Sequence, residues 1–286
     1  MTKPISPLRQ RMIDDMKIRN MSPNTQNIYI SAVARFSAYH RRSPDQLGLE
    51  DIRDYHLHLV SRNLKPTTIN PIMGALRFFY GKTLGQKDIV DEIPYARRAD
   101  SLPAVLSREE VERLLKTVRN LKMRTAFITI YAAGLRVSVL VALTSRDIDS
   151  TRMVIAIRHG KGGKDRYVML SEQLLGILRD YWKRTRPTHW RFPGPDPLQP
   201  VTTRSLQRVF HDAAEAAGLD KNVTVHTPRH SFATHLLKQK VDIRVIQGLL
   251  GHRNINSTTR YTRVAVDTIR QIQSPLEQLN IESPPS

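Results

Sequence analysis

The first 84 residues carry a helical pattern of apolar positions. Apolar side chains recur at three- and four-residue spacing, which gathers them on one face of a helix. SPNT at 22–25 offers a serine N-cap followed by a proline at the first helical position, and KPTT at 65–68 begins a second helix in a similar way. LEDIRDYHLHLV at 49–60 predicts another helix between them. We therefore expect a small all-helical domain at residues 1–90.

This periodicity stops between residues 85 and 103, where charged residues and two prolines take its place. Domain boundaries fall in exposed segments of this kind, so we expect a linker at 91–103. Ser107, with Glu110 three residues later, forms a capping box that opens the next helix. A second domain is accordingly predicted at 104–286.

The most apolar stretch of the second domain runs from Ala126 to Leu143. It is about as long as a membrane span, but Gly134, Arg136 and Ser138 interrupt its centre. We expect one buried core helix here. An arginine on such a helix is costly unless its charge reaches water or meets an anion.

Strand patterns follow this apolar stretch. Short β-branched runs at 152–158 and 165–170 surround the glycine-rich turn HGKGGK, which predicts a hairpin. Amphipathic segments at 171–182 and 202–219 predict two further helices, separated by a proline-rich loop. The fold class is therefore mainly α with a small β-sheet.

The net charge of the chain indicates which class of molecule it binds. The chain has 45 Lys and Arg against 26 acidic residues, a formal charge of +19. Residues 1–100 hold 16 basic and 10 acidic residues, and the remainder holds 29 and 16. Both halves are thus basic, which favours two domains that face a polyanion, and double-stranded DNA is the expected partner.

The chain contains no cysteine, which excludes disulfides, thiol catalysis and thiolate metal sites. No apolar run follows the opening MTKPISPLRQ, so we expect no secretory signal and a cytoplasmic protein. No cofactor is expected.

Residues 222–263 contain a ladder of basic and phenolic side chains. His226 and Arg229 lie three positions apart, His252 follows Arg229 after 23 positions, and Tyr261 follows His252 after nine. Tyr261 lies in STTRYTR, which is polar and basic on both sides, whereas a core tyrosine normally has apolar neighbours at helical spacing. Guanidinium groups suit phosphate because their planar fork binds two oxygens at once. The ladder therefore favours chemistry at a phosphate.

Together with Arg136 in GLRVS and Lys161 in HGKGGKDR, this ladder resembles the tyrosine recombinases, also called the phage integrase family, and most closely their Xer-type and mobile-element members. The resemblance covers nearly the whole chain. It implies a SAM-like core-binding domain followed by a mixed α/β catalytic domain, and a site-specific recombinase that joins DNA through a 3′-phosphotyrosyl intermediate. The residues implied as catalytic are Arg136, Lys161, His226, Arg229, His252 and Tyr261.

Two positions qualify this assignment. The family usually has glutamate where this chain has Val139, which puts the local electrostatics around Arg136 in question. Lys164 shares the glycine-rich loop with Lys161 and is its rival as the proton donor to the leaving oxygen, although alignment with the family favours Lys161.

Other basic side chains could reach DNA phosphates, or could be ordinary solvated charges. These DNA-binding candidates are Arg62, Lys65, Arg77, Lys82, Lys164, Arg204 and Arg208. His226 and His230 also have the i, i+4 spacing of zinc-binding helices, but no H-E-x-x-H pattern is present, so no metal is expected. His230 and His235 are expected to be packed or hydrogen-bonded.

The C-terminal segment 266–286 carries an apolar stripe interrupted by Pro275. The resemblance implies that such a segment is donated to the next protomer, giving a homo-tetramer on two DNA sites, or a hetero-tetramer with a related recombinase. Packing onto its own domain is the alternative. Two other functions stay open, namely a type IB topoisomerase-like nicking-closing enzyme and a non-catalytic DNA-binding regulator. The sequence does not specify the DNA site or the biological role of the exchange.

Overall fold

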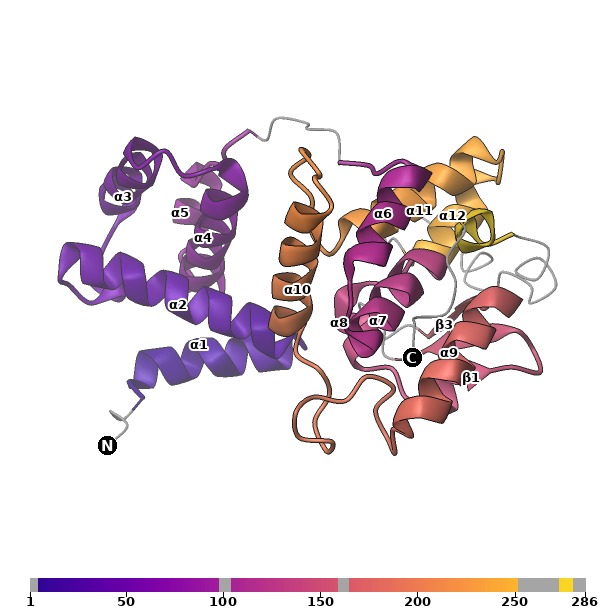
Figure 1. Ribbon diagram of the computed structural model, residues 1–286. Coiled ribbons are helices and arrows are strands. Elements are labelled where there is room, and N and C mark those ends of the chain that lie inside the picture. Colours follow the sequence, from indigo (N-terminus) through magenta and orange to yellow (C-terminus); the bar gives the residue numbers. More distant parts are fainter. Residues whose placement is uncertain (1–4, 98–103, 159–164, 252–272, 280–286) are drawn as a thin grey trace. The chain divides into compact units, whose positions relative to one another are not determined.

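The computed structural model describes residues 5–97, 104–158, 165–251 and 273–279. The chain divides into two compact units, Met1–Ser101 and Leu102–Ser286 (Figure 1). Among the described residues, none of the helices combines the length and apolar character that a membrane span needs.

The first unit is entirely helical. Its elements are α1 (Pro7–Ile18), α2 (Pro23–His40), η1 (Pro44–Gln46), α3 (Leu49–Ser61), α4 (Pro66–Phe78), the π-helical turn η2 (Phe79–Thr83) and α5 (Lys87–Glu92). The predicted helix starts are confirmed: the Ser22 side chain accepts from the Thr25 amide ahead of Pro23, and Lys65 precedes α4. Helices α2 and α4 pack together over a core that includes Phe36.

Part of the predicted linker belongs to this helical unit. Ile93 is only 1% exposed, and the Asn70 side chain donates to the Ala96 carbonyl at 2.9 Å while accepting from the Ala96 amide at 2.8 Å. The Arg77 guanidinium donates to the carbonyls of Val90 and Ile93. The sequence missed this extension because the segment is held by side chains from α4, and neither periodicity nor a long helix marks it.

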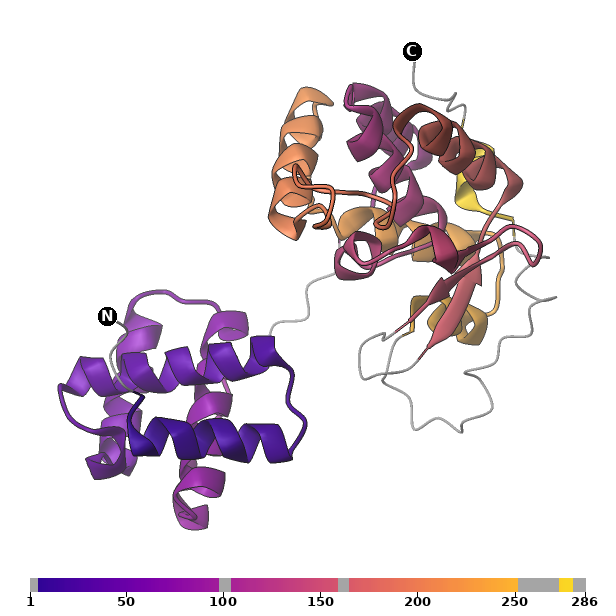
Figure 2. The same cartoon turned by 90° about the horizontal axis from the view of Figure 1, so that it is seen from below.

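In the second unit, helix α7 (Leu121–Ala132) is central and the other helices pack around it. A small sheet lies to one side (Figure 2). The remaining elements are α6 (Arg108–Thr117), α8 (Val137–Val141), η3 (Ser145–Asp147), β1 (Ile148–Asp149), β2 (Val154–Ile157), β3 (Arg166–Met169), α9 (Glu172–Thr185), α10 (Thr203–Ala216), α11 (Thr227–Lys238), α12 (Ile243–Leu250) and η4 (Pro275–Gln278). Helix α7 packs against α6, α8, α9 and α11. Nine of its twelve residues are buried, which explains its apolar sequence.

The three-stranded sheet has the order β1-β2-β3, with both pairs antiparallel. Val154 pairs with Met169 and Ile157 with Arg166, so β2 and β3 form the predicted hairpin. The capping box at the start of α6 is also confirmed, since Ser107 and Glu110 each accept from the other's backbone amide. The turn between β2 and β3, residues 159–164, lies outside the described residues.

The predicted single helix over Ala126–Leu143 is wrong, because the chain breaks at Gly134. This glycine has a φ of +59°, and the amide of Leu135 donates to the carbonyl of Ile130 at 3.0 Å, closing the C-terminal turn of α7. A side chain at 134 would also place its Cβ 2.5 Å from the Phe232 ring. The break leaves Arg136 as the N-cap residue of α8.

The C-terminal residues 274–279 pack onto their own domain in the single chain, and the donation of segment 266–286 to a next protomer stays a prediction. The Ser274 hydroxyl donates to the Ala132 carbonyl at 3.2 Å, and Leu276 and Leu279 join the core, with exposed fractions of 0% and 4%. The apolar positions 266, 269 and 272 lie outside the described residues. The sequence could not decide this point, since an apolar stripe fits its own core and a partner's equally well.

Candidate phosphate-binding site

Arg229 occupies the first turn of α11, a position fixed by Pro228 at the start of that helix. Its side chain is 4% exposed, and its guanidinium donates to the carbonyls of Gly134 and Leu250, each at 2.5 Å. A single guanidinium therefore links the end of α7 to the end of α12.

Arg136 also binds the C-terminal end of α12. Its Nη2 donates to the carbonyl of Gly251 at 3.0 Å, and its side chain is partly buried. Gly251 follows α12 with a φ of +61°, as is typical of a residue that ends a helix. The structure thus brings together two of the predicted catalytic residues, Arg136 and Arg229, which lie 93 positions apart in the sequence.

A third arginine, which the sequence analysis did not single out, lies beside these two. Arg166 is the first residue of β3, and its Nε donates to the carbonyl of Leu249 at 3.1 Å. A basic residue at the strand end after the glycine-rich turn was a visible signal. Its contact with α12 depends on tertiary packing and was not visible.

The three guanidiniums lie in a strongly positive environment. Burial lowers the pKa of Arg136, and burial together with Arg136 and Arg166 lowers the pKa of Arg229 to about 9. None of the ion pairs between described residues joins a carboxylate to any of the three. Because a pKa of about 9 still lies above neutral pH, the guanidinium of Arg229 stays charged, and a bound anion would stabilise it.

His226 is the N-cap residue of α11 and is exposed, three positions before Arg229. Partial burial lowers the pKa of its imidazole, and the neighbouring His230, Arg229 and Arg136 lower it further. A neutral ring can accept a proton, so His226 has the state that a general base needs near neutral pH.

The other two histidines of α11 differ from each other. The interpretation of His235 as structural is confirmed: its Nδ1 lies 2.8 Å from the Tyr131 hydroxyl and its Nε2 lies 3.1 Å from the Leu106 carbonyl. A carbonyl only accepts, so Nε2 carries the proton and Nδ1 accepts from the tyrosine. His230 was expected to be packed or hydrogen-bonded, and the first alternative is wrong because the residue is exposed.

Four site residues of the sequence analysis, Lys161, Lys164, His252 and Tyr261, lie outside the described residues. By sequence, the two lysines fall between β2 and β3, and His252 directly follows Gly251. Their assignment stays a prediction.

The predicted DNA-contacting cations fall into two groups. Exposed side chains are present at Arg62, Lys65, Lys82, Arg204 and Arg208. Arg77 differs, since its guanidinium binds two backbone carbonyls and lies 5.3 Å from the centroid of the Tyr95 ring. These contacts favour the structural interpretation of Arg77 over a phosphate contact.

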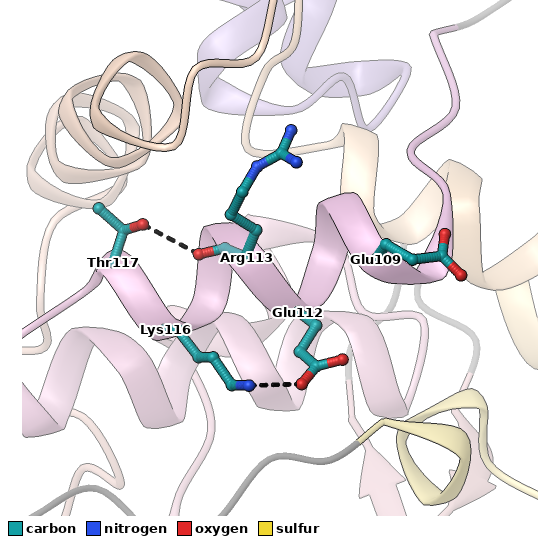
Figure 3. Close-up of a pocket in the computed structure, with 5 residues that line it drawn as sticks. All are labelled: Glu109, Glu112, Arg113, Lys116 and Thr117. Atoms are coloured by element: carbon teal, nitrogen blue, oxygen red, sulfur yellow. Dashed lines mark hydrogen bonds and ion pairs between the residues drawn. The ribbon is translucent and has the colours of Figure 1, made fainter.

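A pocket on the outer face of α6 is separate from the arginines. It is lined by Glu109, Glu112, Arg113, Lys116 and Thr117, and Lys116 pairs with Glu112 across it at 2.6 Å (Figure 3). Lys116 pairs with Glu112 within α6, Glu109 accepts from the Ser107 hydroxyl, and Arg113 donates to the Ala217 carbonyl at the end of α10, so these charged side chains already have partners. Within the described ranges, no three His, Asp or Glu side chains lie close enough together to hold a metal ion.

Comparison with known proteins finds two matching family models. Residues 104–267 match the phage integrase family, and residues 8–88 match the phage integrase N-terminal SAM-like domain. The two matched ranges lie one in each compact unit of the fold.

Two relatives and one solved structure illustrate the similarity. A protein of Sinorhizobium fredii (strain NBRC 101917 / NGR234) named as an integrase/recombinase, y4qK, is 44% identical over 282 residues, covering 98% of this chain and 92% of its own. The tyrosine recombinase XerA of Thermococcus kodakarensis is 33% identical, covering 90% and 91%. The integrase of transposon Tn1549, solved with circular intermediate DNA, has a TM-score of 0.68 at 20% identity over 92% of this chain and 97% of its own, a likeness in fold.

Proposed function

From the premise that this chain belongs to the phage integrase family and is a tyrosine site-specific recombinase, we propose that it cuts and rejoins DNA through Tyr261. The observation that carries this proposal is the convergence of Arg136 and Arg229 on the end of α12. These charges lie without a carboxylate partner among the described ion pairs, directly before the segment that contains His252 and Tyr261.

In the proposed reaction, the phenolate oxygen of Tyr261 attacks the scissile phosphorus in line with the 5′ oxygen. The new O–P bond forms as the P–O5′ bond breaks, which leaves a 3′-phosphotyrosyl ester and a free 5′ hydroxyl. A phenol, with a pKa of about 10, needs a base or nearby cations before it is a good nucleophile. We assign proton removal to His226 and protonation of the leaving oxygen to Lys161.

Arg136 and Arg229 would stabilise the crowded phosphorane, with His252 assisting them. A fixed cation aimed at charge that develops in the transition state is worth several kcal/mol in typical cases. No metal or nucleotide is required, because the phosphotyrosyl ester keeps the energy of the broken phosphodiester. The 5′ hydroxyl of a second DNA site then attacks that ester. This exchange calls for a synapse of four protomers on two DNA sites, formed by this chain alone or with a related recombinase.

Because the DNA sequence that this protein cuts is not known, the first step of the experiment is to identify it. The full chain is incubated with genomic fragments, and DNA covalently attached after denaturation is sequenced. A nicked duplex made from a recovered site should then give a slow-moving protein–DNA band on a denaturing gel. Tyr261→Phe should lose the band and all strand exchange while keeping its affinity for the duplex.

Tyr167→Phe is the matched control, because Tyr167 is an exposed tyrosine of the same unit, 42% accessible to solvent. It should form the band as the parent chain does. Undiminished joining by Tyr261→Phe would refute the proposal. A band accompanied only by relaxed plasmid would favour the topoisomerase-like reaction, and no band on any site would favour a regulator.

A further inference from the structure

The end of α12 is held by three arginines from three separate segments. Three consecutive carbonyls, of Leu249, Leu250 and Gly251, accept from Arg166, Arg229 and Arg136 respectively. Helix C-termini present unpaired carbonyls and partial negative charge, which cations stabilise. A single cation would normally suffice for that purpose, so three of them call for a further explanation.

Arg166 is fitted closely to the backbone at this point. A Cβ at position 251 would lie 2.9 Å from both Cζ and Nη1 of Arg166, so the guanidinium rests directly against the glycine. The next residue in the chain is His252. Arg166 therefore holds the backbone at the point where α12 ends.

Two nitrogen atoms of the three guanidiniums lack a hydrogen-bond partner. Nη1 of Arg136 and Nη2 of Arg166 are buried, and neither has a hydrogen-bond partner. Burial lowers the pKa of Arg166 to about 10, with repulsion from Arg136 as the second cause. Unsatisfied buried donors and mutually repelling charges are both costly, and one bound anion would relieve both costs.

The same domain contains an arginine that only caps a helix. Arg113 donates its Nε to the carbonyl of Ala217, at the end of α10, at 2.8 Å. That residue is exposed to solvent. A structural brace can therefore work from an exposed position, whereas Arg166 is partly buried beside Arg136 and Arg229.

We propose that Arg166 is the third guanidinium of the phosphate site: it holds the end of α12 against β3 and adds its charge to those of Arg136 and Arg229, so that one phosphate is the counter-ion of all three. This inference rests on the proposed function for the identity of the anion as a DNA phosphate. It adds a third phosphate-binding residue to the two arginines that the sequence predicted.

The first test uses inorganic phosphate as the probe and requires no DNA. Thermal unfolding of the full chain is followed against phosphate concentration, with chloride holding the ionic strength constant. The parent chain should gain thermal stability with phosphate. Arg166→Gln should need roughly tenfold more phosphate for the same gain, as expected for a lost charge-assisted contact, whereas Arg113→Gln should respond like the parent.

A purely structural brace gives a different result. Arg166→Gln would then unfold at a lower temperature in chloride but gain as much from phosphate as the parent, and this outcome would overturn the inference. So would a parent chain that gains nothing from phosphate beyond the chloride control. If Arg166→Gln does not fold, Arg166→Lys decides, since it keeps the charge and should retain most of the phosphate response; a folded lysine variant without that response would count against the inference.

The second test uses the recovered nicked duplex. Arg166→Gln should slow formation of the covalent band by about 10- to 100-fold with unchanged duplex affinity, and Arg166→Lys should recover part of the rate. The two proposals can fail separately. A phosphate response that depends on Arg166, in a chain that never forms the covalent band, would retain this inference and reject the tyrosine chemistry.

Discussion

Arg136 lies within the most apolar stretch of the chain. The free-energy cost of burying its charge there depends on which group its guanidinium contacts. The sequence predicts that such an arginine reaches water or an anion, whereas the structure gives it a backbone carbonyl as its partner. Its Nη2 binds the Gly251 carbonyl, and its Nη1 stays without a hydrogen-bond partner. The two N–H groups of Nη1 are therefore left for a ligand. Val139 provides no carboxylate to neutralise the guanidinium.

His235 makes the stability of the second unit dependent on pH. Burial is the main cause that lowers its pKa below the ordinary 6.5. The folded state thus resists protonation more than the unfolded chain does. Its contribution is complete above pH 6.5 and is lost as the pH falls below 6.5, with a slope of at most about 1.4 kcal/mol per pH unit for one histidine.

This expectation is checked by urea unfolding of the parent chain and of His235→Gln between pH 8 and pH 5. Glutamine can still donate to the Leu106 carbonyl and accept from the Tyr131 hydroxyl, but it does not titrate. The free energy of unfolding of the variant should fall less steeply below pH 6.5. Equal slopes for the two proteins would show that His235 does not carry the effect.

Gly134 shows how one turn arranges the elements that carry Arg136 and Arg229. It ends α7, turns the chain so that Arg136 begins α8, and offers its carbonyl to Arg229. Its positive φ and its contact with Phe232 leave no room for a side chain. The same backbone position therefore ends α7 and holds Arg229 at the candidate phosphate site.

Gly134→Ala should destabilise the chain by more than about 2 kcal/mol, since it combines left-handed strain of 1–2 kcal/mol with overpacking against the Phe232 ring. Gly176→Ala is the matched control. Gly176 lies inside α9 with nothing within 4 Å of a built Cβ, so alanine there should stabilise by about 0.5–1 kcal/mol. Chemical unfolding of both variants measures the difference, and equal effects would contradict this account of Gly134.

Both units carry a positive balance of charge, so DNA binding should be strongly salt-dependent. Arg204 and Arg208 are exposed and lie four residues apart on α10, the spacing of neighbours on one helix face. We propose that both contact DNA phosphates. Each would then release counter-ions when the duplex binds.

Replacing Arg204 and Arg208 together with glutamine should reduce the slope of log affinity against log salt by about two, one for each phosphate contact. Arg179→Gln is the control, because Arg179 is exposed on α9, away from α10 in both views (Figures 1 and 2). Binding to an arbitrary duplex, measured by fluorescence anisotropy at several salt concentrations, gives the slopes. An unchanged slope in the double variant would remove these arginines from the interface.

The sequence by itself determined the local features of this protein. Helix starts at Ser22, Lys65 and Ser107 were predictable because a cap needs only neighbouring residues, and the hairpin followed from two β-branched runs around a glycine-rich turn. The roles of Arg136 and Arg229 came from spacing and family resemblance and stay predictions, while the structure shows that both residues bind the end of α12.

Only the tertiary structure decided the features that depend on distant neighbours. Phe232 leaves no room for a side chain at Gly134, Arg166 contacts the end of α12 through the carbonyl of Leu249, and Leu276 packs into its own domain. In each case the sequence shows a residue type that several environments would accept. The choice is made by a contact with a residue tens of positions away, and local pattern contains no record of such a contact.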